Sequence, residues 1–147
     1  MSTLTLATAL LCMLASGALF AFSAFVMGAL DRLAPEHGLL AMQSINRRAV
    51  TRAFMTALFA PAALCVAVAI GDGSAVAIAG AALYLLGPIG TTIAGNVPLN
   101  DALARIEPAD PQAERLWRDY SRRWTALNHL RTALGIAAAA LLVAAGA

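Results

Sequence analysis

Four long apolar stretches in a short chain constrain this fold more than any other feature of the sequence. They lie at about residues 4–30, 53–70, 75–95 and 126–144. A helix needs about 20 mostly apolar residues to cross the hydrocarbon core of a bilayer. The chain has 147 residues, of which 61% are apolar and 12% charged, so little remains for a soluble domain. We therefore predict an all-α, single-domain, integral membrane bundle of four transmembrane helices.

The first apolar stretch is interpreted as a retained helix rather than a secretory signal. A signal peptide opens with a positive segment and has an apolar core of about 7–15 residues. Here no basic residue precedes Arg32, and the apolar run is much longer.

Arginine alone reports the orientation, because the chain contains no lysine. Nine of the ten basic residues flank the predicted connections 31–52 and 96–125, whereas the connection at 71–74 and both termini have none. The positive-inside rule places those two connections in the cytoplasm and both termini outside. Acidic residues are interleaved with the arginines, so the connections do not form the basic patch of a nucleic-acid-binding protein.

Prolines predict where the helices bend or break. Residues 34–38 predict a turn, with helix resuming afterwards. Pro61 predicts a kink in the second span. Val97 precedes Pro98 and is therefore biased away from helix, so a break is predicted at this pair. From Pro111 onward no proline or glycine interrupts the chain for more than twenty residues, which predicts one long fourth helix that extends into the cytoplasm.

Polar side chains within or beside a span are costly and are therefore functional candidates. In this chain they gather near the cytoplasmic ends of three predicted spans. They are Gln43, Asn46 and Arg47, then Asn96 and Asn100, then Asn128, His129 and Arg131. If the helices pack as a bundle, these side chains converge on one polar cavity that opens toward the cytoplasm.

Each of these candidates also has a structural interpretation. Arg131 lies too deep to be simply interfacial, and it either pairs with Asp101 or backbone carbonyls, or binds an anionic substrate. His129 is the best candidate base of the chain, although a histidine in a bundle can serve packing alone. Trp117, Tyr120 and Trp124 form one stripe of the fourth helix with Asn128 and Arg131, either as interfacial aromatic residues or as a planar wall for a flat ligand.

The sequence predicts no metal and no cofactor. His37 is predicted in a solvated turn, and Cys12 and Cys65 are predicted at the outer face, where a disulfide is conceivable but not required. No catalytic triad, phosphate-binding glycine loop or paired buried carboxylates are present, so hydrolase and nucleotide-dependent chemistry are not predicted.

Two strings coincide with this polar cluster: residues 95–100, which read Gly-Asn-Val-Pro-Leu-Asn, and residues 124–132, which read Trp-Thr-Ala-Leu-Asn-His-Leu-Arg-Thr. With them, and with residues 17–30 and 41–46, the chain resembles the anthrone-oxygenase-like family of small four-helix membrane proteins, many of them bacterial. The resemblance extends over nearly the whole chain. It implies a bacterial cytoplasmic membrane location.

The resemblance also implies a chemistry, because fungal relatives are associated with oxidising anthrones to anthraquinones without metal or flavin. By this analogy His129 removes a proton from a flat phenolic substrate, and the resulting anion passes an electron to O₂. Asn96, Asn100, Asn128 and Arg131 then hold the oxyanion. Analogy at the level of a family does not establish function by itself.

Two hypotheses follow. In the first, the chain is a cofactor-independent oxygenase, or a binder of flat phenols, anthrones or quinones, whose partners are the lipid bilayer and a hydrophobic small molecule. In the second, it is a non-enzymatic membrane subunit or scaffold whose polar residues only lock helix ends. The sequence leaves open whether the chain is catalytic and whether it forms a homo-oligomer or joins a larger membrane complex.

Overall fold

The computed structural model describes residues 2–146, and every regular element in this part of the chain is helical. Some helices are α-helical and two are π-helical, with hydrogen bonds that reach five residues back. In chain order they are α1 (Thr3–Ala21), η1 (Phe22–Val26), α2 (Met27–Leu30), α3 (Pro35–Ala49), α4 (Arg52–Asp72), α5 (Ala75–Tyr84), η2 (Leu85–Asn96), α6 (Val97–Leu103) and α7 (Ala113–Ala145).

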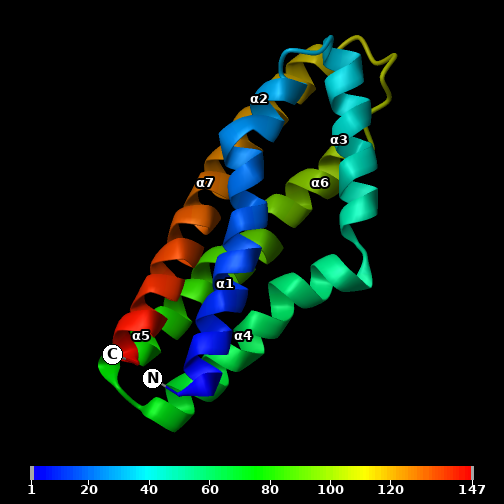
Figure 1. Ribbon diagram of the computed structural model, residues 1–147. Coiled ribbons are helices and arrows are strands. Elements are labelled where there is room, and N and C mark those ends of the chain that lie inside the picture. Colours follow the sequence, from blue (N-terminus) through cyan, green and yellow to red (C-terminus); the bar gives the residue numbers. More distant parts are fainter. Residues whose placement is uncertain (1, 147) are drawn as a thin grey trace.

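Contiguous elements join into four helices that are long and apolar enough to cross a membrane. They are Thr3–Leu30, Arg52–Asp72, Ala75–Leu103 and Ala113–Ala145. The predicted all-helical, multi-pass membrane bundle is therefore confirmed. The start of α1, the end of α7 and the α4–α5 turn lie at one end of the bundle (Figure 1). The loops that follow α2 and α6 lie at the other end, which we call the charged end, and α3 runs back from it to a joint with α4 part way along the bundle (Figure 1). The predicted cytoplasmic location of the charged end remains a prediction.

Short polar side chains start several of these helices. Ser2, Thr51 and Ser74 have extended backbones, and their hydroxyls accept hydrogen bonds from backbone N–H groups of the first turns of α1, α4 and α5. Such caps satisfy donors that have no partner within the helix. Gly73, with φ of +70°, makes the tight turn between α4 and α5, because a left-handed conformation is favourable only for glycine.

The predicted break at Val97 and Pro98 is wrong, because one continuous helix runs through this point into α6. Val97 has helical dihedral angles, φ −62° and ψ −50°. Its N–H donates to Thr92 O, five residues back, and closes the π-helical segment η2. The hydrogen-bond pattern changes from π to α at Pro98, which has no backbone N–H. Because the pattern is interrupted at this residue, the missing donor costs little free energy.

The predicted turn over residues 34–38 is shorter than expected, because α3 already begins at Pro35. Proline is favourable in a first helical turn, where its missing N–H would have no helical partner. Gly38 then allows α3 to approach α7 closely: a Cβ there would lie 3.0 Å from the Trp117 ring and 2.9 Å from Leu30 O.

The long fourth helix is confirmed, although it begins at Ala113 rather than Pro111. At 1.5 Å per residue, its 33 residues reach about 50 Å, well beyond a hydrocarbon core of about 30 Å. Pro61, where a kink is predicted, lies inside α4.

The buried side chains form two clusters, one at each end of the bundle. The cluster toward the chain termini holds small residues with Tyr84, Cys12 and Cys65, and the two cysteine Sγ atoms lie 3.6 Å apart as free thiols. The cluster toward the charged end is aromatic and includes Trp117, Tyr120 and Trp124 packed against α3. Polar groups that could carry function lie between these two cores.

Candidate functional site

A cavity of about 380 Å³ lies at the joint between α3 and α4, and we call it the joint cavity. Four parts of the chain enclose it: α1 with η1, the α3–α4 joint, η2 with α6, and α7. The main lining residues are Ala18, Phe22, Met42, Asn46, Phe54, Leu58, Thr92, Asn96, Asn100, Trp124 and Arg131. Its volume is in the usual range for sites that bind small organic molecules, and its wall is mostly apolar with few polar groups.

Arg131 is the only deeply buried cation among the described residues, with 6% of its surface exposed. Its Nε donates to Asn128 Oδ1 at 2.8 Å, and its Nη1 donates to Thr92 Oγ1 at 3.0 Å. The guanidinium also lies 5.0 Å from the centre of the Trp124 ring, a cation–π distance. The sequence left open pairing with Asp101 or backbone carbonyls, but the hydrogen bonds of Arg131 go to side-chain oxygens of other residues.

No carboxylate balances this charge within residues 2–146. The ion pairs of that part of the chain, Arg118 with Glu114 and Arg122 with Asp119, lie on the exposed extension of α7. A buried charge without a counter-ion is unfavourable unless polar groups or a ligand compensate it. The joint cavity therefore presents positive charge to whatever occupies it.

Asn100 orients the aromatic wall of the joint cavity. Its Oδ1 accepts hydrogen bonds from Tyr120 OH and from Trp124 Nε1, each at 2.9 Å. Asn46 Nδ2 donates to the same Tyr120 hydroxyl at 3.4 Å, which connects α3 to this network. Trp124 in turn packs against Phe22, with ring centres 5.5 Å apart. The flat face beside Arg131 is thus fixed by hydrogen bonds at its edge.

Asn96 contributes an unused acceptor. Its Nδ2 donates to Trp124 O at 3.3 Å, while its buried Oδ1 has no hydrogen-bond partner. An unsatisfied buried oxygen costs free energy and is uncommon in native structures. Since the acceptor oxygen of Asn100 is already occupied, its amide N–H groups are left for a ligand. The joint cavity therefore offers one acceptor from Asn96, and donors from Asn100 and Arg131.

Two other predicted polar residues are occupied by helix packing. Gln43 donates to Leu103 O at 2.9 Å and to Ile106 O at 3.0 Å, which fastens α3 to the end of α6. Asn128 is fully buried and donates to Leu19 O and Ser23 Oγ on the first helix. Asn128 does not line the joint cavity, but its Oδ1 accepts a hydrogen bond from Arg131 and so orients that side chain. Trp117 packs on α3 outside this cavity.

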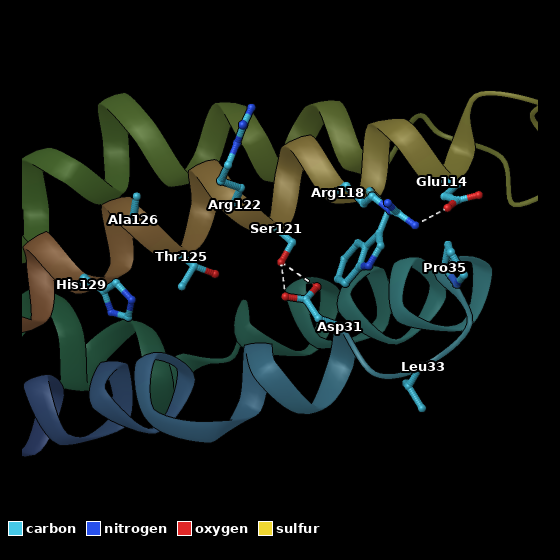
Figure 2. Close-up of a pocket in the computed structure, with 11 residues that line it drawn as sticks. Asp31, Leu33, Pro35, Glu114, Arg118, Ser121, Arg122, Thr125, Ala126 and His129 are labelled. Carbon is cyan, nitrogen blue, oxygen red and sulfur yellow. Dashed lines mark hydrogen bonds and ion pairs between the residues drawn. The ribbon is translucent and has the colours of Figure 1, made fainter.

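His129 does not face the joint cavity. It lies on the exposed side of α7 and lines a separate, more open groove of about 610 Å³, which we call the α7 groove (Figure 2). Asp31 also lines this groove, and both of its carboxylate oxygens accept from Ser121 Oγ, at 2.7 and 2.8 Å (Figure 2). The α7 groove has exposed charged walls, as expected of a solvated helix face.

The stripe of the fourth helix is confirmed, because Trp117, Tyr120, Trp124, Asn128 and Arg131 are all buried on one side of α7. Fewer of the predicted polar residues share one cavity than the sequence suggested. Asn46, Asn96, Asn100, Trp124 and Arg131 line the joint cavity. Sequence reasoning missed Thr92 and Phe22, which come from the π-helical segments η2 and η1.

π-Helical turns are rare in proteins overall, and those that occur are often found at functional sites. In the sequence, the only signal for η2 is Pro88 within a span, followed four residues later by Thr92, whose hydroxyl donates to Pro88 O at 2.5 Å. No comparable signal precedes η1. Residues 2–146 contain no group of three or more histidine, cysteine or acidic side chains arranged to hold a metal ion.

The Asn100 network can be tested by Asn100→Ala. This change leaves Tyr120 OH without its acceptor and Trp124 Nε1 without its partner, and each unsatisfied buried donor costs about 1–3 kcal/mol. We expect a lower melting temperature and a shifted tryptophan emission spectrum in detergent. Asp101→Ala, at the exposed neighbouring position, is the control. Wild-type melting and emission in Asn100→Ala would contradict the network.

Comparison with known proteins identifies one family. No curated protein and no solved structure matches the chain. The sequence model of the anthrone oxygenase family matches residues 42–141, about two-thirds of the chain. The match runs from within α3 to within α7 and so includes Asn46, Asn96, Asn100, Trp124 and Arg131. The chain belongs to the anthrone oxygenase family.

Proposed function

We propose that this protein is a cofactor-independent oxygenase that binds the anionic form of a flat hydrophobic phenol, of the anthrone class, in the joint cavity. The observation that favours this function most is Arg131. It is buried, has no carboxylate partner, and stands beside the flat Trp124 ring at the edge of a largely apolar space. An apolar planar anion would supply both the missing charge and the apolar surface.

The chemistry requires stabilisation of negative charge rather than a cofactor. An anthrone that loses a proton from its CH₂ group becomes an aromatic oxyanion, and this anion transfers one electron to O₂. The resulting carbon radical and superoxide combine, and after protonation they form a hydroperoxide at the same carbon. Loss of water, with cleavage of the O–O bond and the remaining C–H bond, gives the second carbonyl. One O₂ is consumed and one water is released for each quinone.

Within this scheme the side chains have different roles. Arg131 and the free amide hydrogens of Asn100 stabilise the oxyanion by donors fixed before the ligand binds, the arrangement that lowers such barriers most effectively. Asn96 Oδ1 accepts a hydrogen bond from a hydroxyl group of a phenolic substrate. Trp124 and Phe22 cover the rings. Asn128 acts through its hydrogen bond to Arg131 and is a positioning residue.

The source of the base differs from the analogy with the family. Within the lining of the joint cavity the ionisable side chains are Arg48 and Arg131, and the lining contains no histidine or carboxylate. We therefore favour proton loss to water, driven by the stabilised anion, over direct abstraction by His129. The role of His129 as a base remains a prediction from the sequence.

Purified protein in lipid vesicles tests the proposal directly. With anthrone as substrate, we expect O₂ uptake of one molecule per anthrone and formation of anthraquinone, faster than in protein-free vesicles. The protein should be colourless and should work after treatment with chelators. No acceleration over protein-free vesicles, or activity that requires a haem or flavin, would refute the proposal.

His129→Ala separates the two possible bases. Because the side chain lies on the exposed face of α7, we expect O₂ uptake close to that of wild type. The measurement is the initial rate in vesicles. If the variant keeps the wild-type melting temperature but loses most of its activity, then His129 is the base.

One observation favours the scaffold hypothesis for part of the cluster. Gln43 donates to the backbone carbonyls of Leu103 and Ile106. Asn128 donates to Leu19 O and Ser23 Oγ, and both patterns are expected of residues that lock helix ends. Binding of 1,8-dihydroxyanthraquinone, a stable planar phenol, distinguishes the hypotheses. A scaffold would not bind it, whereas the proposed site would bind it and quench tryptophan fluorescence.

A further inference from the structure

A second, smaller space adjoins the joint cavity on the side away from the charged end of the molecule. This apolar crevice, of about 150 Å³, is lined by Leu14, Ala15 and Ala18 of α1, and by Phe54, Ala57 and Leu58 of α4. Ala18, Phe54 and Leu58 line both spaces. The two spaces are therefore neighbours, and the smaller one lies between two membrane-spanning helices.

Every residue of the apolar crevice is apolar, and its outer rim is exposed on the surface of the bundle. Leu14 is 62% exposed, and Ala18 is also exposed, within segments of a length and composition that cross the membrane. In Figure 1, α1 and α4 lie side by side toward the end that holds the termini. An exposed apolar rim at this level contacts lipid chains rather than water.

The charged end of the joint cavity is closed by α3. Met42 is buried against the aromatic core, and Gln43 fastens the helix to the carbonyls of Leu103 and Ile106. In Figure 1, α3 runs from the charged end along the side of α7 to the α3–α4 joint. A ligand that came directly from the water at this end would have to separate these packed helices. Apart from the rim of the crevice, the exposed lining residues of the joint cavity are Arg48 and Val50 at the α3–α4 joint and Val97 of α6.

We infer that the apolar crevice between α1 and α4 is the passage through which a bilayer-dissolved ligand reaches the joint cavity. The ligand class is an uncharged, planar, hydrophobic phenol that partitions into the membrane and becomes the anion at Arg131. A neutral molecule crosses the apolar wall without a desolvation cost for charge. This inference rests on the proposed function and adds the route and the charge state of the arriving ligand.

The experiment uses full-length protein in vesicles with 1,8-dihydroxyanthraquinone dissolved in the bilayer beforehand, and stopped-flow quenching of tryptophan fluorescence. Ala57→Phe narrows the crevice from α4, at a residue that does not line the joint cavity. We expect association and dissociation rates to fall together by about ten-fold, with the dissociation constant changed less than about two-fold, because a narrower passage slows entry and exit alike. Leu14→Trp, on the opposite wall, should reproduce this result if Ala57→Phe does not fold.

Gly17→Phe is the matched control, because a Cβ at this position of α1 meets no atom within 4 Å and Gly17 lines neither space. Unchanged rates in both Ala57→Phe and Leu14→Trp would overturn the inference, and so would slower association in Val50→Phe alone, which would place the route at the α3–α4 joint. If the wild type does not bind the probe, the proposed function fails, and the inference fails with it. Binding with unaltered rates refutes the passage alone.

Discussion

Arg131→Met is expected to lower O₂ uptake with anthrone by about two to three orders of magnitude, the usual effect of removing one donor to a developing oxyanion. Methionine fills a similar length with apolar atoms, but it supplies neither charge nor hydrogen bonds. Arg131 donates to Asn128 Oδ1 and Thr92 Oγ1 and lies over the Trp124 ring, so its charge is held in one place. The assay is initial O₂ uptake in vesicles at saturating anthrone.

The fold should survive this change with a modestly lower melting temperature, because Asn128 Oδ1 loses its donor at a cost of about 1–3 kcal/mol, while the cost of burying an unpaired charge is removed. Melting temperature in detergent therefore separates loss of chemistry from loss of structure. Arg123→Met, at an exposed position of the same helix, is the matched control and should keep wild-type activity. Arg131→Lys keeps the charge but loses the planar donor set, so we expect partial activity. An active Arg131→Met variant would refute the role of this arginine in the reaction.

Gly135→Val is expected to be the most destabilising of the substitutions considered, because α1, η2 and α7 meet at this glycine. A Cβ at Gly135 would collide with Ser16 Oγ and lie 3.0 Å from Pro88 Cγ. Ser16 cannot turn away freely, because its hydroxyl donates to Cys12 O at 2.7 Å. Overpacking of this kind costs about 1–3 kcal/mol or more. Small residues at such crossings let membrane helices approach closely.

The measurement is the melting temperature of purified protein. In a chain of this size it falls by about 2–4 °C for each kcal/mol of unfolding free energy that is lost. Gly28→Val is the control, because a Cβ at that position meets nothing within 4 Å. Both variants place a β-branched residue in a transmembrane helix. The difference between their melting temperatures therefore reports the close packing of the three helices at Gly135. Equal melting temperatures would show that the three helices do not pack as closely as described.

Much of the molecule follows from local sequence. The four spans, the grouping of charges at one end and the long fourth helix depend on hydropathy and on spacing along a single helix, and these are properties of neighbouring residues. For the same reason the buried stripe from Trp117 to Arg131 could be predicted, since residues three and four apart share one face of a helix wherever that helix packs. The family resemblance predicted from the two short strings is confirmed by the match over residues 42–141.

The partition of the polar cluster could not be predicted in this way. His129 and Arg131 are two residues apart, and two positions along a helix turn the side chain by about 200°. Which of them faces the bundle depends on where α1, α3 and η2 pack against α7, and no local pattern gives that. Gln43 and Asn128 were also predicted as site residues. The carbonyl groups to which they donate lie 60 or more positions away in the sequence, so no local pattern could show that helix packing occupies them.

The sequence by itself determined that the chain is a four-span membrane protein of the anthrone oxygenase family, with its polar candidate residues toward the charged end. Only the tertiary structure decided which of them share a cavity. It placed Arg131 with Asn96, Asn100 and Trp124, turned His129 to the outside, and carried the helix through Pro98 by a π-helical segment. The physical reason is that helix formation follows local hydropathy and propensity, whereas a binding cavity is set by the packing of helices distant in sequence.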